Sequence, residues 1–155
     1  MPAEDRLCTL RHADGSVRTV RVRDEEHPYP DGKLIVSRTD PAGVITHANA
    51  AFIEMSGYTV DELIGQPHHI LRHPDMPAAA FADLWQTVAR GDKWHGYVKN
   101  LRKDGSHYWV YATVIPNVRG GRVVGYTSVR RKPSRTRVDE CMALYARLVA
   151  EEGAR

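Results

Sequence analysis

The residues that could do chemistry are concentrated in one run, Gly65–Pro77. Its ionisable side chains are those of His68, His69, Arg72, His73 and Asp75, and prolines stand at positions 67, 74 and 77. Proline fixes φ and lacks a backbone N–H donor, so the run cannot form one long helix. Polar side chains held on an irregular segment commonly contact a ligand. We therefore predict that this run forms one wall of a ligand site.

The three histidines of the run are open to more than one interpretation. Imidazole can ligate a metal or a haem iron. Haem needs one well-placed histidine rather than a cluster, and zinc usually adds cysteine, histidine or carboxylate ligands in a closed geometry. Solvated or capping histidines are therefore the favoured interpretation, with metal and haem binding kept as alternatives.

Arg72 also has two possible roles. Its guanidinium can bind a phosphate through two parallel hydrogen bonds, or it can pair with Asp75 inside the protein. The first role would hold a ligand and the second would be purely structural. Both remain open at the level of the residues alone.

Composition indicates one folded domain. The chain has 155 residues, of which 42% are apolar and 26% charged, as in ordinary globular proteins. It contains no apolar run of the length that a membrane span needs, and its first residues do not resemble a signal peptide. We expect a cytoplasmic protein. The cysteines, Cys8 and Cys141, are far apart and indicate neither a disulfide framework nor a zinc site.

Charge and motifs exclude several classes of function. The formal net charge is +3, and the densest basic cluster lies at 130–137, at a junction between a strand and the tail. We interpret this cluster as a solvated linker and expect no nucleic-acid binding, because no recognition motif accompanies it. Glycine-rich nucleotide loops and nucleophile elbows are absent from the sequence, so we do not expect an enzyme.

Patterning predicts an α+β fold. Alternation around an Asp-Gly turn at 13–16 predicts a hairpin over 5–23, followed by a linker at 24–32. Five further strands are expected at 33–37, 44–47, 94–102, 107–118 and 122–130. Helical segments are expected at 50–56, 61–65, 78–90 and 137–152. This order predicts a five-stranded antiparallel sheet with short helices on one face.

Several short motifs together resemble a known family. They are Asp40–Phe52, Ser56–Tyr58, Asp61–Gly65 and Arg102–Ser106, with the strand around Tyr108. This set resembles a PAS domain over residues 33–131, which leaves an N-terminal extension at 1–32 and a C-terminal linker helix at 132–155. A denser set of matches resembles the FAD-binding sensor domain of bacterial aerotaxis receptors. Those matches are Ile45–Asn49, Gly65–His68, Arg72–Pro77, Ala79–Asp83 and Lys99–Asn100.

The resemblance implies roles for individual residues. It implies that FAD is bound noncovalently and that redox state is reported to a chemotaxis-type signalling module. It places Arg72, His73 and Asp75 in the stretch that holds FAD, with Asn49, Trp94 and Asn100 at other positions of the pocket. His68 stands where flavin-based light sensors have a cysteine, so no light-driven thiol adduct is expected. Val110 stands where those sensors have a second asparagine.

The residue types are compatible with a flavin. Aromatic faces are available from Trp85, Trp94, Tyr97, Trp109 and Tyr111. The amide of Asn100 can donate and accept at a ring edge, whereas Asn49 is equally suited to cap a helix. Tyr126, Ser128 and Arg130 share one face of the last strand, and Ser128 is small enough to leave room for a ring if that face points inward.

Three functions follow from these observations. The leading hypothesis is an FAD-binding redox or oxygen sensor that acts as a homodimer and relays its state to a signalling partner. The alternatives are a cofactor-free dimerisation module and a haem-based gas sensor. The absorption spectrum of the purified protein separates them.

Overall fold

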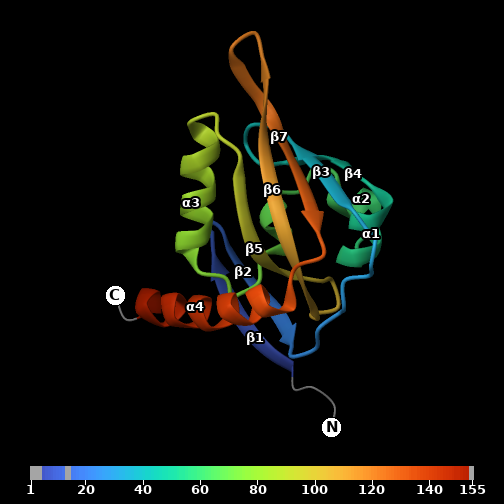
Figure 1. The fold of residues 1–155 in the computed structure, drawn as a ribbon. Coiled ribbons are helices and arrows are strands. Elements are labelled where there is room, and N and C mark those ends of the chain that lie inside the picture. Colours follow the sequence, from blue (N-terminus) through green and yellow to red (C-terminus); the bar gives the residue numbers. More distant parts are fainter. Residues whose placement is uncertain (1–4, 13–14, 154–155) are drawn as a thin grey trace.

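The computed structural model describes residues 5–12 and 15–153. The chain opens with a separate two-stranded hairpin, formed by β1 (Asp5–Arg11) and β2 (Val17–Arg23), which pair antiparallel. The predicted hairpin is therefore confirmed, although part of its predicted turn, residues 13 and 14, lies outside the described residues. An extended linker follows and leads into the main sheet (Figure 1).

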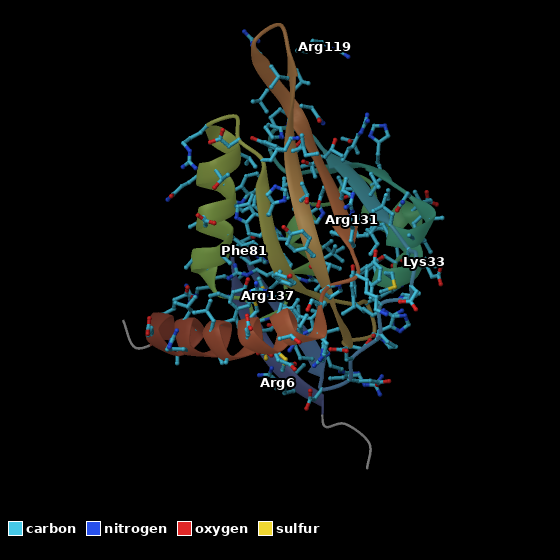
Figure 2. All side chains as sticks on the ribbon, in the orientation of Figure 1. Arg6, Lys33, Phe81, Arg119, Arg131 and Arg137 are labelled. Atoms are coloured by element: carbon cyan, nitrogen blue, oxygen red, sulfur yellow. The ribbon has the colours of Figure 1, made fainter. Side chains whose placement is uncertain are left out.

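The main sheet has five strands in the order β4-β3-β7-β6-β5, all antiparallel to their neighbours. Its strands are β3 (Ile35–Thr39), β4 (Ile45–Ala48), β5 (Trp94–Leu101), β6 (His107–Arg119) and β7 (Arg122–Arg131). Strands β6 and β7 extend beyond the rest as a long hairpin, with Arg119 near its tip (Figure 2). The α+β class and the antiparallel sheet are thus as predicted.

Cross-strand pairing decides which side chains share a face of this sheet. Ser37 pairs with Ser128, which pairs with Val114, and Val114 pairs with Trp94. The neighbouring row contains Ile35, Arg130, Ala112 and Gly96. Opposed residues lie on the same side of a sheet, so these two rows form one face. We call it the inner face because the short helices pack against it.

Four helical segments cover the inner face. They are α1 (Ala50–Ser56), α2 (Val60–Leu63), the 3₁₀ helix η1 (His68–Leu71) and α3 (Ala78–Ala89). The side chain of Asn49 caps α1, and Gly57 ends that helix with a φ of +78°. Thr59 and Glu62 form a reciprocal capping box on α2. Between η1 and α3 the chain is irregular, as its prolines require.

The linker between the hairpin and the sheet belongs to the core. Tyr29 is 7% exposed and packs in the same apolar cluster as Ile35, Phe52 and Tyr108. Its hydroxyl donates to the carbonyl of Lys33 at 2.7 Å or to that of Arg130 at 2.9 Å. The hairpin itself packs on Leu101 at the end of β5 through a smaller cluster.

The last helix, α4 (Arg135–Gly153), lies on the opposite, outer face of the sheet. Tyr145 stacks on Trp109 with ring centroids 6.2 Å apart, and Val138 is 1% exposed. Tyr97 pairs with Tyr111 on this outer face, two residues from the Lys99–Trp109 pair, so these aromatic residues do not line the space beneath the short helices, contrary to expectation. Cys141, Tyr145 and Leu148 form the packed face of α4, and Leu144 is 40% exposed.

Candidate functional site

A buried arginine lies at the centre of the inner face. Arg130, near the end of β7, is 2% exposed. Its guanidinium donates to the Ser37 hydroxyl at 2.8 Å and to Nε2 of His68 at 3.1 Å, and it lies 4.6 Å from the centre of the Phe52 ring. We call Arg130, His68, Ser37 and Phe52 the Arg130 cluster.

The partners of this guanidinium are all neutral. Burial lowers the pKa of Arg130 to about 10, which still leaves it charged at neutral pH. Burial and the neighbouring Arg130 charge lower the pKa of His68 to about 3, so His68 is a neutral acceptor. Among the described residues, Nε of Arg130 has no hydrogen-bond partner. A buried cation normally has an anionic partner, and here the contacts of the guanidinium within the described residues include none.

Other predicted residues lie on the same inner face. Ser128 is half-buried beside Ser37, which confirms that the Tyr126–Arg130 alternation points inward. Asn100 is 6% exposed and opposes Tyr108, whose pKa burial raises to about 12. Trp94 is buried and its Nε1 donates to Asp83 at 2.8 Å.

Gly96 explains how the Trp94 indole fits against the sheet. A Cβ at position 96 would lie 2.3 Å from the ring of Trp94. The absence of a side chain there therefore lets the indole lie flat on the inner face. Any ring-shaped ligand of this face would have the Trp94 indole as a neighbour.

The run after η1 forms a second polar group. The Asp75 carboxylate pairs with Lys99 at 2.8 Å and with Arg6 of the hairpin at 3.0 Å. Nδ1 of the fully buried His73 accepts the Asp75 backbone N–H at 3.0 Å. We call Asp75, Lys99, Arg6 and His73 the Asp75 cluster. Arg6 is labelled on the hairpin at the end of the molecule opposite Arg119 (Figure 2).

Each charged group of the Asp75 cluster has a partner of opposite charge. Although burial opposes it, the Lys99 and Arg6 cations lower the pKa of Asp75 to about 2. Burial and the Lys99 charge lower the pKa of His73 to about 3. The cluster therefore consists of a carboxylate between two cations and a neutral histidine that accepts the Asp75 backbone N–H.

Arg72 does not form the internal pair with Asp75 that the sequence left open. Its guanidinium donates to the carbonyl of Arg11 on the hairpin at 3.1 Å and lies 5.0 Å from the ring centre of Phe81 on α3. Among the described residues its Nε has no hydrogen-bond partner. Arg72 is thus a half-buried cation at the meeting point of the hairpin, the run and α3.

Two predicted residues lie apart from these groups. The Asn49 amide oxygen accepts from Phe52 N and Val36 N, and its nitrogen donates to the Leu34 carbonyl at 2.9 Å. Its oxygen and one of its two N–H donors are therefore used by the backbone around α1. Trp85 is 43% exposed and contacts Tyr126 edge to face.

Sequence reasoning did not select Arg130 as a site residue. The residue stands beside Arg131 and Lys132, and that basic run was interpreted as a solvated linker. The available signal was the alternation that placed Arg130 on the same face as Ser128. Arg130 is buried by Phe52 and His68, and these two residues come from elements far away in the sequence.

The described residues contain cavities but no cluster suited to a metal ion. No set of three or more histidine, cysteine, aspartate or glutamate residues in the described part of the chain is arranged to hold a metal ion. In the same residues, no helix is long and apolar enough to cross a membrane. A cavity of about 430 Å³ lies by β4 and α2, and one of about 150 Å³ lies where the linker meets α4.

Comparison with known proteins decides the family. The sequence profile described as the PAS fold matches residues 45–130. The chain belongs to the PAS family. The match covers strands β4, β5, β6 and β7 and every helix of the inner face, whereas the hairpin, the linker, β3 and α4 lie outside it.

This PAS domain is similar to several sensory and regulatory proteins. It is 47% identical to the aerotaxis receptor of Escherichia coli K12 over 129 residues, which is 83% of this chain and 26% of the receptor. It is 35% identical to the biofilm dispersion protein BdlA of Pseudomonas aeruginosa PAO1 over 57% of this chain and 22% of that protein. The chain therefore spans about a quarter of the length of these relatives.

Solved structures agree with the fold. A light-oxygen-voltage domain studied with a flavin analogue has a TM-score of 0.61 and 27% identity, covering 79% of this chain and 87% of that one. The light-state structure of the Aureochrome1 LOV domain gives a TM-score of 0.61 at 24% identity, covering 78% and 91%. The PAS fold is thus common to this chain and to domains studied as photoreceptors.

Proposed function

We propose that this PAS domain is a sensor that binds FAD noncovalently and reports redox state or oxygen to a signalling partner. The observation that carries the proposal is the buried Arg130 guanidinium, surrounded by neutral acceptors. Because a buried charge without an anionic partner is costly, it is most simply explained as one half of a ligand contact. The similarity to an aerotaxis receptor supports a redox role.

The residues fit a flavin chemically. The pyrimidine edge of a flavin is electron-rich, and its polar groups both donate and accept hydrogen bonds. Arg130 offers a charged donor, His68 a neutral imidazole and Asn100 an amide, all at the inner face. Ser128 is small and half-buried, and Trp94 offers an aromatic surface. We assign the ring edge to these residues and the diphosphate to Arg72.

The cavity of about 430 Å³ is lined by Ser37 of the Arg130 cluster but not by Arg130, His68 or Phe52. Trp94, Phe52 and His68 fill the inner face in this structure. Binding of a ring therefore requires these side chains to move apart. His73 and Asp75, which the family resemblance places at the cofactor, are held by Lys99 and the hairpin and would act by positioning Arg72.

Bound flavin would supply reversible electron transfer, with a change of negative charge at the ring. Arg130 would hold a positive charge opposite that edge and favour the more negative state. A change in the contacts of Arg130 would reach β3 through Ser37 and the linker through the Tyr29 hydroxyl. Because Arg130 lies five residues before α4 begins, the same change would alter the start of that helix. The signalling partner and a homodimeric state remain part of the proposal.

The absorption spectrum of the purified protein tests this function. We expect a yellow protein, or one that becomes yellow when reconstituted with FAD, whose visible bands bleach on reduction. A colourless protein that takes up no FAD and is dimeric by light scattering would support the cofactor-free module instead. An intense Soret band would support the haem sensor.

A further inference from the structure

The last turn of α4 contacts the first turn of α3. The Glu152 carboxylate accepts the backbone N–H groups of Ala78 and Ala79, each at 3.0 Å. Helix α3 begins after Pro77 and has no capping side chain of its own. Glu152 therefore satisfies two donors that the helix leaves unpaired and places a negative charge at its positive end.

Further contacts fix α4 along its length. The Tyr145 hydroxyl donates to the Tyr97 carbonyl at 2.7 Å, in addition to the stacking of its ring on Trp109. Val138 anchors the start of the helix. Figure 1 shows α4 running across the end of the sheet to reach the lower end of α3. Glu152 therefore makes the last contact that holds α4 against the rest of the domain.

The same place holds the cation that we assign to the cofactor. Phe81, over which Arg72 lies, is in the first turn of α3, three residues after Ala78. The Glu152 charge favours the protonated form of Arg72 and so opposes the effect of burial, which lowers the pKa of that guanidinium. The Arg72 cation therefore interacts with the Glu152 carboxylate and, under the proposed function, with the diphosphate of FAD.

We propose that Glu152 couples cofactor binding to the docking of α4. The diphosphate and the Glu152 carboxylate are like charges that interact with the same cation, Arg72, so each weakens the binding of the other. FAD binding then releases the last turn of α4, and docked α4 lowers the affinity for FAD, because such coupling is reciprocal. This inference rests on the proposed function and adds its regulation.

Two neighbouring glutamates allow a matched test. Glu152→Gln keeps the shape of the side chain and removes its charge, and Glu151→Gln does the same at an exposed position. We expect the dissociation constant for FAD, measured by flavin fluorescence, to fall about fivefold in E152Q and to stay unchanged in E151Q. Hydrogen exchange of residues 148–153 should be faster in ligand-free E152Q than in ligand-free wild type. Adding FAD should accelerate it in wild type.

The outcomes separate the two proposals. If wild type binds FAD and E152Q binds it no more tightly, the coupling is overturned and the flavin assignment stands. If neither protein binds FAD, both proposals are overturned. If E152Q does not fold, the exchange of residues 148–153 in wild type decides alone, and unchanged or slower exchange on adding FAD overturns the coupling.

Discussion

The Arg130 cluster and the Asp75 cluster both contain a histidine with a pKa near 3 and a cation removed from solvent, yet they are built in opposite ways. In the Asp75 cluster, a carboxylate lies within 3.0 Å of two cations, so each cation has an anionic partner inside the protein. In the Arg130 cluster the hydrogen-bond partners of the guanidinium are neutral. The paired cations need no group from outside the chain, whereas we propose that a ligand completes the unpaired one.

This difference divides the polar run Gly65–Pro77 into two parts. Within it, His73 and Asp75 connect the hairpin to β5, whereas His68 contacts Arg130 at the inner face and Arg72 contacts α3. Under the proposed function, residues that are close in sequence therefore have different roles, structural for the first pair and ligand-binding for the second.

The largest effect is expected at Arg130. Arg130→Met removes the unbalanced cation, and we expect FAD affinity to fall about 100-fold, the loss of a strong charge-assisted contact. The melting temperature of the ligand-free protein should change little, because relief of charge burial offsets the two lost hydrogen bonds. The control is Arg131→Met, at an exposed neighbouring position. Unchanged FAD affinity in R130M would show that both clusters are structural.

The next effect is expected at Asp75. Asp75→Asn leaves Lys99, whose side chain is 10% exposed, without its anion. We expect the free energy of unfolding of the ligand-free protein to fall by about 2 kcal/mol, measured by urea denaturation. Adding Lys99→Met should restore most of the lost free energy of unfolding, and Asp92→Asn, at an exposed site, should leave that free energy unchanged. Normal stability combined with loss of FAD would instead make Asp75 a cofactor residue.

Acid should destabilise both clusters through their histidines. The pKa values of His68 and His73 lie near 3 in the folded protein and near 6.5 when unfolded, so between these values the unfolded chain binds more protons. Stability should therefore fall as pH drops from about 6.5 towards 3, by about 1.4 kcal/mol per pH unit for each histidine. His68→Gln and His73→Gln should each reduce this slope, whereas His47→Gln, at an exposed site, should not. An unchanged slope in H73Q would mean that His73 is not neutral in its cluster.

The smallest effect is expected at Trp85, which belongs to neither cluster. Because it is 43% exposed, Trp85→Ala should lower the free energy of unfolding by less than about 1 kcal/mol. FAD affinity should stay within about twofold of wild type, since a half-exposed ring at Tyr126 adds little to an inner-face contact. Loss of flavin from a stable W85A protein would extend the ligand site to the exposed face of α3.

Local features made most of the fold predictable from sequence. Asn49 and Gly57 mark both ends of α1, and the prolines of the polar run forbid a long helix, so these boundaries follow from neighbouring residues. The site was less predictable because its contacts are long-range. Asp75 meets Arg6 across 69 positions and Arg130 meets His68 across 62, and no local pattern carries that information. Periodicity places Arg130 on the same face as Ser128, but only tertiary packing shows that this face points inward and that the guanidinium has neutral partners.

Tyr29 has a consequence for how this domain can move between proteins. Its ring lies in the main core and its hydroxyl reaches the backbone of Arg130, although it stands before residues 45–130, which the family profile matches. The stretch that defines the family is therefore shorter than the unit that folds. A chimaera joined at residue 33 would carry every family motif but lack a wall of its own interior, so a functional transplant must begin upstream of Tyr29.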